Sequence, residues 1–126
     1  MLCKNPYMIR GMACPCNKCM PCRFNRRRLW THRILLETMK LTDSCFLTLT
    51  YDDAHLPAGG TLVPGDGQLF LKRLRKAIFP LQLRYFFVGE YGDTSNRPQY
   101  HAALFGIPSS FTEIVQKAWG KGHVML

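Results

Sequence analysis

Acidic residues are scarce in this chain of 126 residues. Eight Asp and Glu stand against 17 Lys and Arg, so the formal net charge is +9 at pH 7. The chain also lacks any apolar run near the ~18 residues that a membrane-spanning helix needs, and it lacks the apolar core of a signal peptide at its N-terminus. We therefore expect a cytosolic, soluble protein whose charge favours phosphate-rich partners, either nucleic acid or an anionic membrane surface.

Internal repeats and low-complexity tracts are also absent. Hydrophobic residues make up 47% of the chain and aromatic residues 12%, which indicates a folded globular protein rather than a disordered one. A chain of this length corresponds to one domain, or to a small core with an appended module.

Five of the six cysteines lie within the first 22 residues. In a reducing compartment such cysteines favour thiol or metal chemistry over disulfides. In "CPCNKCMPC", Cys16, Cys19 and Cys22 follow two successive C-x-x-C spacings, and Cys3 is the expected fourth ligand because Cys14 lies too close to Cys16. The pattern predicts a structural Zn²⁺ site in a knuckle over residues 1–22, with free thiols and an iron–sulfur cluster as alternatives.

A basic helix is predicted over residues 23–41, "RFNRRRLWTHRILLETMKL", where Trp30 and Ile34 lie four apart. Positive charge in its first turns opposes the helix dipole, which indicates a role other than helix stability. Contact with a phosphate backbone is the functional interpretation, and a solvated basic face is the alternative. The residues concerned are Arg23, Arg26, Arg27 and Arg28.

The remainder of the chain has an α+β pattern, so we divide the sequence into a knuckle, 1–22, and a core, 23–126. The core should hold a strand at 45–51, a Pro/Gly loop at 52–67, a basic helix at 68–79, a hairpin of strands 83–91 and 98–106, and a serine-capped helix at 109–122. "HVML" at 123–126 reads as the start of another strand. We therefore expect the fold to continue beyond Leu126.

The hairpin places three polar side chains near one another. Gln99 and His101 alternate onto one face of their strand, and Glu90 faces Gln99 if Tyr91 lies opposite Pro98. A carboxylate, an amide oxygen and an imidazole suit Mg²⁺ or Mn²⁺. Spacing alone leaves open an ordinary polar hairpin without a metal.

Four segments of the chain, in this order, resemble one family. They are "PCNKCMPCRFNRRRLWTHRILLE", "CFLTLTYDDAHLP", "FLKRLRKA" and "YFFVGEYGDTSNRPQYHAALFG". Together they resemble the replication initiators of gokushovirus-type microviruses, single-stranded DNA phages, within the HUH endonucleases. The resemblance implies a central antiparallel sheet with flanking helices. It also implies nicking of single-stranded DNA at a phage origin, through a tyrosine that becomes linked to the 5′ phosphate.

The resemblance also assigns roles to residues. Gln99 stands where the family's His-x-His motif has its first histidine, His101 is the second, and Glu90 matches the third ligand of a Mn²⁺ or Mg²⁺ site. The first motif, "FLTLTY", has a role that is either structural or DNA-contacting. The basic helix would flank the DNA path through Lys72, Arg73, Arg75 and Lys76.

The family's third motif, a Tyr followed by a Lys on a helix, has no counterpart in these residues, so the nucleophile is expected beyond Leu126. The resemblance implies action in the host cytoplasm, with room for contacts to host replication machinery and no membrane partner. Two other readings remain. One is a non-catalytic, zinc-stabilised protein that binds single-stranded nucleic acid, and the other is a zinc-stabilised structural protein whose charge only keeps it soluble.

Overall fold

The computed structural model describes residues 2–40 and 43–126. They form two compact units, one ending at Met39 and one starting at Lys40. The division differs from the sequence-based one after residue 22, because the first long helix belongs with the cysteine-rich segment. In the described residues we find no helix with the length and apolar character needed to cross a membrane.

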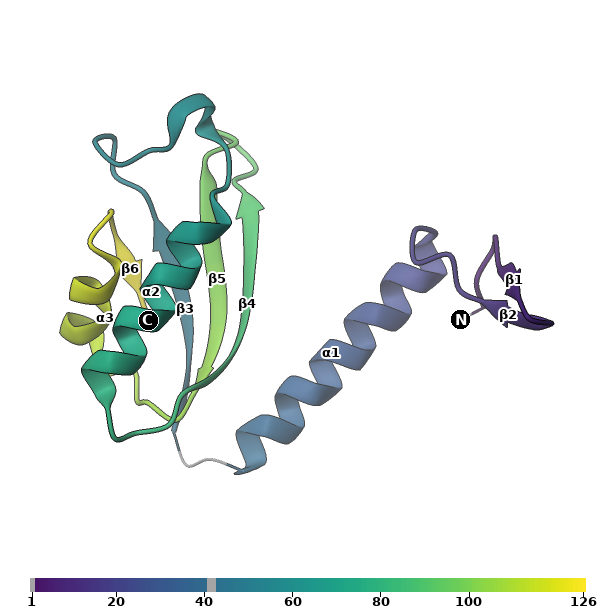
Figure 1. The fold of residues 1–126 in the computed structure, drawn as a ribbon, viewed down its shortest axis with the longest axis horizontal. Coiled ribbons are helices and arrows are strands. Elements are labelled where there is room, and N and C mark those ends of the chain that lie inside the picture. Colours follow the sequence, from purple (N-terminus) through teal and green to yellow (C-terminus); the bar gives the residue numbers. More distant parts are fainter. Residues whose placement is uncertain (1, 41–42) are drawn as a thin grey trace. The chain divides into compact units, whose positions relative to one another are not determined.

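The first unit consists of a small hairpin followed by a long helix (Figure 1). Strand β1 (Tyr7–Ile9) pairs antiparallel with β2 (Met12–Cys14). Arg10 and Gly11 form the connection with φ of 49° and 77°, the left-handed conformations that a two-residue hairpin turn requires. Helix α1 spans Met20–Lys40.

Helix α1 begins three residues earlier than predicted, and Leu41, which the prediction included, lies outside the described residues. The early start places Pro21 in the first turn, where its missing N–H leaves no intrahelical bond unmade. Cys22 also falls in that turn, so the cysteine cluster and the helix share residues.

The second unit is built on a four-stranded antiparallel sheet. Its strands are β3 (Ser44–Thr50), β4 (Arg84–Tyr91), β5 (Pro98–Phe105) and β6 (Val124–Met125), and their spatial order is β4-β5-β3-β6. The α+β class, the central antiparallel sheet and the short final strand are confirmed. The hairpin β4–β5 occupies one side of the sheet, and β3 lies across β5 from it.

Helices α2 (Pro64–Ile78) and α3 (Thr112–Trp119) lie on the same side of this sheet (Figure 1). Alternate residues of β3 and β5, such as Leu49 and Tyr100, pack with Leu74 of α2 and Trp119 of α3 in one core. The intervening residues of each strand face the opposite side, which the helices of this unit leave open. Function therefore has one sheet face available for polar side chains.

Two helix boundaries differ from the prediction. Helix α2 starts at Pro64 rather than at residue 68, because proline fits the first helical position and Asp66 places a favourable negative charge in the first turn. Helix α3 follows Phe111 without any side-chain cap, so the predicted serine cap is wrong. Its predicted glycine end is confirmed, since Gly120 adopts the left-handed conformation with φ of 61°.

Candidate metal centres

The four predicted cysteine ligands lie together in the first unit. The Sγ atoms of Cys3, Cys16, Cys19 and Cys22 all lie within 4.8 Å of one another. The Sγ–Sγ distance is 3.9 Å between Cys16 and Cys22 and 3.8 Å between Cys19 and Cys3. Sulfurs held about 2.3 Å from a tetrahedral zinc lie about 3.8 Å apart, so the cluster could hold a metal ion such as zinc. Cys14 lies outside the group, as its spacing predicted.

Backbone N–H groups point at the sulfurs of this cluster. The amides of Lys18 and Cys19 donate to Cys16 Sγ at 3.4 and 3.3 Å, and the amide of Lys4 donates to Cys19 Sγ at 3.4 Å. These amide bonds lower the pKa of the Cys16 thiol, and the Lys4 amide leads the causes that lower the pKa of Cys19 to about 6. Burial raises the pKa of Cys22 to about 12. The cluster is thus prepared for thiolates, the form that binds metals.

The second group of predicted ligands lies on the open face of the sheet. Strands β4 and β5 pair with Tyr91 opposite Pro98 and Glu90 opposite Gln99, which is the register expected from the sequence. His101 lies two residues along β5 on the same face, opposite Val88. The hairpin therefore brings a carboxylate, an amide and an imidazole to one place.

All three side chains meet at one carboxylate oxygen. Glu90 Oε1 accepts a hydrogen bond from Gln99 Nε2 at 2.7 Å and lies 2.6 Å from His101 Nε2. The side chains of Glu90 and His101 are 51% and 22% exposed, so the group is open to solvent and to a ligand. The hydrogen bond from Gln99, followed by that from His101, lowers the pKa of Glu90, which keeps the carboxylate ionised at neutral pH.

This donor set fits a hard or borderline divalent ion. The carboxylate is charged and solvent-accessible, the imidazole directs Nε2 toward it, and a half-turn of the Gln99 amide exchanges its nitrogen for its oxygen. A neutral amide oxygen at position 99 favours Mn²⁺ or Mg²⁺ over softer metals. The residues present are therefore compatible with the catalytic ion expected from the resemblance.

Strand β3 supplies two neighbours of His101 that the sequence did not single out. Thr48 lies directly opposite His101, and its Oγ1 is 3.1 Å from His101 Nδ1. Phe46 stacks on the imidazole with ring centroids 5.6 Å apart and an angle of 19°. Both residues belong to "FLTLTY", so this segment holds the histidine ring in place. The alternation of that segment was the available signal, but which strand it pairs with is not encoded locally.

The tyrosines of the second unit are engaged elsewhere. Tyr51 donates to Asp66 Oδ2 at 2.7 Å, and Tyr100 donates to the Val63 carbonyl at 2.7 Å. Both are buried, and desolvation raises the pKa of Tyr51 further above its ordinary value. The Tyr91 hydroxyl accepts a hydrogen bond from the Leu62 amide. Their environments favour packing roles, as expected from the sequence.

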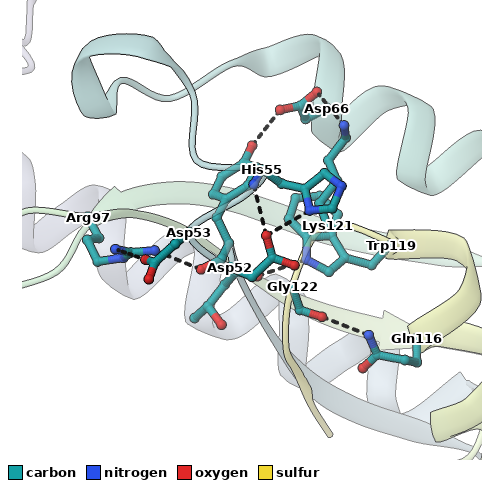
Figure 2. A network of polar contacts seen from close by, with 11 residues as sticks. Asp52, Asp53, His55, Asp66, Arg97, Gln116, Trp119, Lys121 and Gly122 are labelled. Atoms are coloured by element: carbon teal, nitrogen blue, oxygen red, sulfur yellow. Dashed lines mark hydrogen bonds and ion pairs between the residues drawn. The ribbon is translucent and has the colours of Figure 1, made fainter.

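A polar network anchors the loop after β3 (Figure 2). Asp52 Oδ1 accepts a hydrogen bond from the His55 backbone amide at 2.8 Å and lies 2.7 Å from His55 Nδ1. Arg97, at the start of β5, donates to the Tyr51 carbonyl and to Asp53, both at 3.0 Å. The indole of Trp119 donates to the Thr50 carbonyl at 2.9 Å. These bonds fix the end of β3, and with it the position of Thr48 against His101.

The predicted DNA-binding residues lie on two helices. The arginines Arg23, Arg26, Arg27 and Arg28 are exposed on the first half of α1. Lys72, Arg73, Arg75 and Lys76 lie on α2, where the Arg75 guanidinium is 5.1 Å from the centre of the Tyr85 ring. Both sets supply cations from rigid elements, which suits contact with phosphates.

Comparison with known proteins gives consistent matches. A family model described as that of the replication-associated protein ORF2 matches residues 44–126. Replication-associated protein VP4 of Bdellovibrio phage phiMH2K is 39% identical over 104 residues, which cover 77% of this chain and 33% of that protein. Replication-associated protein ORF2 of Spiroplasma virus 4 is 34% identical over 112 residues, covering 82% of this chain and 35% of that protein.

Replication-associated protein ORF4 of Chlamydia phage 1 is 32% identical over 96 residues, covering 73% of this chain and 24% of that protein. The chain thus spans about a third or less of the length of these relatives. No solved structure matches the chain.

Proposed function

This chain belongs to the family of phage replication-associated proteins that the ORF2 model describes, and from that membership we propose that it acts in the initiation of phage DNA replication. Its role in this proposal is metal-dependent nicking of single-stranded origin DNA. The family membership supports an action on replication, and the side chains on the open sheet face support the chemistry.

One observation carries the nicking proposal: Gln99 and His101 both meet Glu90 Oε1 at hydrogen-bond distance. Three donors from two paired strands converge on a rigid, exposed sheet face, where they can hold a divalent ion beside a phosphate. An ion bound there supplies Lewis-acid polarisation of the scissile phosphate and neutralises charge on its oxygens.

The residues of this chain position the reacting groups. Glu90, Gln99 and His101 hold the ion's ligand atoms in place, and Thr48 fixes the imidazole ring. In the nicking step a tyrosine oxygen forms a bond to phosphorus and the bond from phosphorus to the 3′ oxygen breaks. The tyrosine proton passes to the leaving 3′ oxygen, which yields a free 3′ hydroxyl. We place that tyrosine outside residues 1–126, because the tyrosines near the sheet are committed to other bonds.

The cysteine cluster has a separate role in the proposal. Cys3, Cys16, Cys19 and Cys22 bind Zn²⁺ as a structural site, which fixes the first turn of α1. Arginines 23, 26, 27 and 28 follow that turn directly, so the zinc positions cations against the DNA backbone. This contact is independent of sequence and sensitive to salt. The whole protein acts in the host cytoplasm, where host replication enzymes would extend the 3′ end.

The first test is divalent-ion binding to the 126-residue chain. Mn²⁺ titration followed by electron paramagnetic resonance should show one site in the parent chain, with binding about tenfold weaker or more in Glu90→Gln and His101→Ala variants. His55→Ala removes an exposed histidine outside this site and should bind Mn²⁺ as the parent does. Equal affinity in all four proteins would contradict the proposed metal centre.

The second test is a covalent-adduct assay with single-stranded origin DNA and Mn²⁺. A chain extended to the length of its relatives should form an adduct of DNA and protein on a denaturing gel, and its His101→Ala version should not. An adduct on the 126-residue chain would show that one of its own tyrosines is the nucleophile.

The alternative is a binding protein without nuclease activity, and the amide at position 99 is the observation that favours it. In that case both chains would bind single-stranded DNA with or without Mn²⁺. Neither would form an adduct.

A further inference from the structure

Strand β4 presents two different environments on its two faces. Glu90 directs its carboxylate to the metal donors on the open face, whereas Gly89, one residue earlier, faces the helix side near Tyr100 and Leu62. In the described four-stranded sheet β4 is an edge strand, paired only with β5. A flexible polymer that crosses this edge can therefore reach both faces over a short path.

The helix side of β4 is hollowed at this point. A cavity of about 400 Å³ lies between the start of α2 and β4, with Leu62, Gly67, Phe87 and Gly89 among its walls. Gln68, Leu71 and Tyr85 line it as well, and they also line a second cavity of about 280 Å³. Because the two cavities share three residues, they form one groove along the edge of the sheet.

Two glycines determine the space in this groove. A Cβ at position 89 would lie 3.1 Å from both δ carbons of Leu62, and a Cβ at position 67 would lie 2.7 Å from the Phe87 ring. Glycine is unfavourable inside both strands and helices, so it marks a close approach of backbones. Here the glycines let α2 sit close to β4 while one wall of the groove stays free of side-chain atoms.

The chemistry of the groove is graded from aromatic to cationic. Its first part has apolar and aromatic walls, and its second part is lined by Lys72 and Arg75. The Arg75 guanidinium lies 5.1 Å from the centre of the Tyr85 ring, which is 40% exposed. Among the described residues, no acidic side chain lines either cavity. A flat ring with an attached phosphate matches this arrangement, because the ring stacks on Tyr85 while the phosphate meets the cations.

We propose that this groove, named here the β4 groove, binds one nucleotide of single-stranded DNA close to the phosphate held at Glu90. The base enters between Leu62, Gly67 and Tyr85, and the adjoining phosphate lies at Lys72 and Arg75. The strand crosses the edge of the sheet at Gly89. This inference rests on the proposed nicking function, since that function brings the strand to Glu90.

The test uses the 126-residue chain and a fluorescein-labelled single-stranded oligonucleotide, followed by anisotropy. Tyr85→Leu should weaken binding about tenfold, because it removes the stacking surface, and Tyr85→Phe should restore it to within about twofold. Phe79→Leu is the matched control, since Phe79 is 82% exposed and lines neither cavity. That control should bind as the parent does.

Abasic substitutions locate the bound nucleotide. In the parent chain, removal of one base at a single position of the oligonucleotide should weaken binding, and in Tyr85→Leu the same removal should have no further effect. Free deoxynucleoside monophosphate should compete only at far higher concentration than the oligonucleotide, which separates a nucleotide within a strand from a free one.

Metal binding separates this inference from the proposed function. Tyr85→Leu should retain the Mn²⁺ affinity of the parent, because Tyr85 faces away from Glu90. If Tyr85→Leu binds the oligonucleotide as tightly as the parent, or if no single abasic position matters, the groove does not hold a nucleotide. A parent chain that binds no single-stranded DNA overturns the inference as well. Loss of the metal site alone would instead appear as equal Mn²⁺ affinity in Glu90→Gln and the parent.

Discussion

At the scale of single residues, the orientation of one imidazole determines what the sheet site can bind. His101 Nε2 must present a lone pair to a metal ion, which requires its remaining proton on Nδ1. Thr48 Oγ1 lies 3.1 Å from Nδ1 and can accept that proton or, in the metal-free state, donate its own. The hydroxyl thus satisfies both tautomers without moving the ring. Thr48 is a positioning residue.

Thr48→Val tests this role with little change in shape or strand propensity. Mn²⁺ affinity should fall about tenfold, since loss of an outer partner of a metal-binding histidine has an effect of that order. Thr48→Ser keeps the hydroxyl and should restore most of the affinity. Nitrogen-15 NMR of His101 should show the Nδ1–H tautomer in the Mg²⁺-bound parent and a mixture in the valine variant. Unchanged tautomers and unchanged affinity would show that Thr48 serves only to pack.

At the scale of secondary-structure elements, helix α3 shows how much depends on its last turn. Gly120 ends the helix at φ of 61°, and its amide donates to the Gln116 carbonyl at 3.0 Å. Gly120→Ala should lower the free energy of unfolding by about 1 kcal/mol, because a Cβ is unfavourable in this conformation. Urea unfolding followed by circular dichroism measures the difference.

Gly65→Ala is the matched control for that change. Gly65 lies in the first turn of α2, and a Cβ there meets no atom within 4 Å. The substitution should be neutral or stabilise by about 0.5 kcal/mol, because it only reduces the entropy of the unfolded chain. Equal destabilisation by both substitutions would mean that loss of glycine, rather than the left-handed cap, is responsible.

The loop after β3 should respond to acid through Asp52. Hydrogen bonds from His55, its side chain first, lower the pKa of Asp52 below its ordinary value. The carboxylate therefore contributes stability above its unfolded pKa, near about 4, and that contribution is lost as pH falls through the lower folded value. Asp52→Asn should destabilise the unit at pH 7, and its difference from the parent should shrink below about pH 4.

Urea unfolding at a series of pH values checks this prediction through Trp119 fluorescence, in a Trp30→Phe background that leaves a single tryptophan. Asp53→Asn is the control, because the Asp53 side chain is 96% exposed. It should produce a smaller change at every pH. A constant difference between parent and Asp52→Asn from pH 7 to pH 3 would contradict the assignment.

The elements also show which features the sequence encodes locally. Alternation along the hairpin predicted that Glu90, Gln99 and His101 share a face, because a two-residue period and a short turn fix the register. The contact of Thr48 with His101 joins residues 53 apart in the chain. Their pairing depends on the order of strands in the sheet, which no local pattern specifies. The start of α2 was missed because Pro64 and its glycines were interpreted as a loop, although proline suits a first helical turn.

At the scale of the whole molecule, the two units depend on different sources of stability. The second unit buries a continuous core of leucines and aromatic rings, including Phe70, Leu74 and Trp119. In the first unit the buried residues of α1 are Pro21 and Cys22, and the hairpin strands are largely exposed. Two three-residue strands cannot stabilise themselves in water, so the cysteine cluster must supply the missing constraint.

Metal removal should therefore affect the units unequally. The purified chain should contain one Zn²⁺, and a chelator at pH 7 should release it with loss of helical circular dichroism from α1. Trp119 fluorescence and urea unfolding of the second unit should stay unchanged. Affinity for single-stranded DNA should fall as well, because Arg23 and Arg26 lose their fixed position next to Cys22.

Two serine substitutions distinguish ligand cysteines from the remaining one in this segment. Cys19→Ser should bind zinc much more weakly and resemble the chelated protein, since Cys19 Sγ lies 3.8 Å from Cys3 Sγ within the cluster. Cys14→Ser should keep one zinc per chain, because Cys14 lies outside that group. If iron rather than zinc is found, visible absorption will reveal a cluster. If neither metal is found and the chelator has no effect, the first unit must be held by something other than these four thiolates.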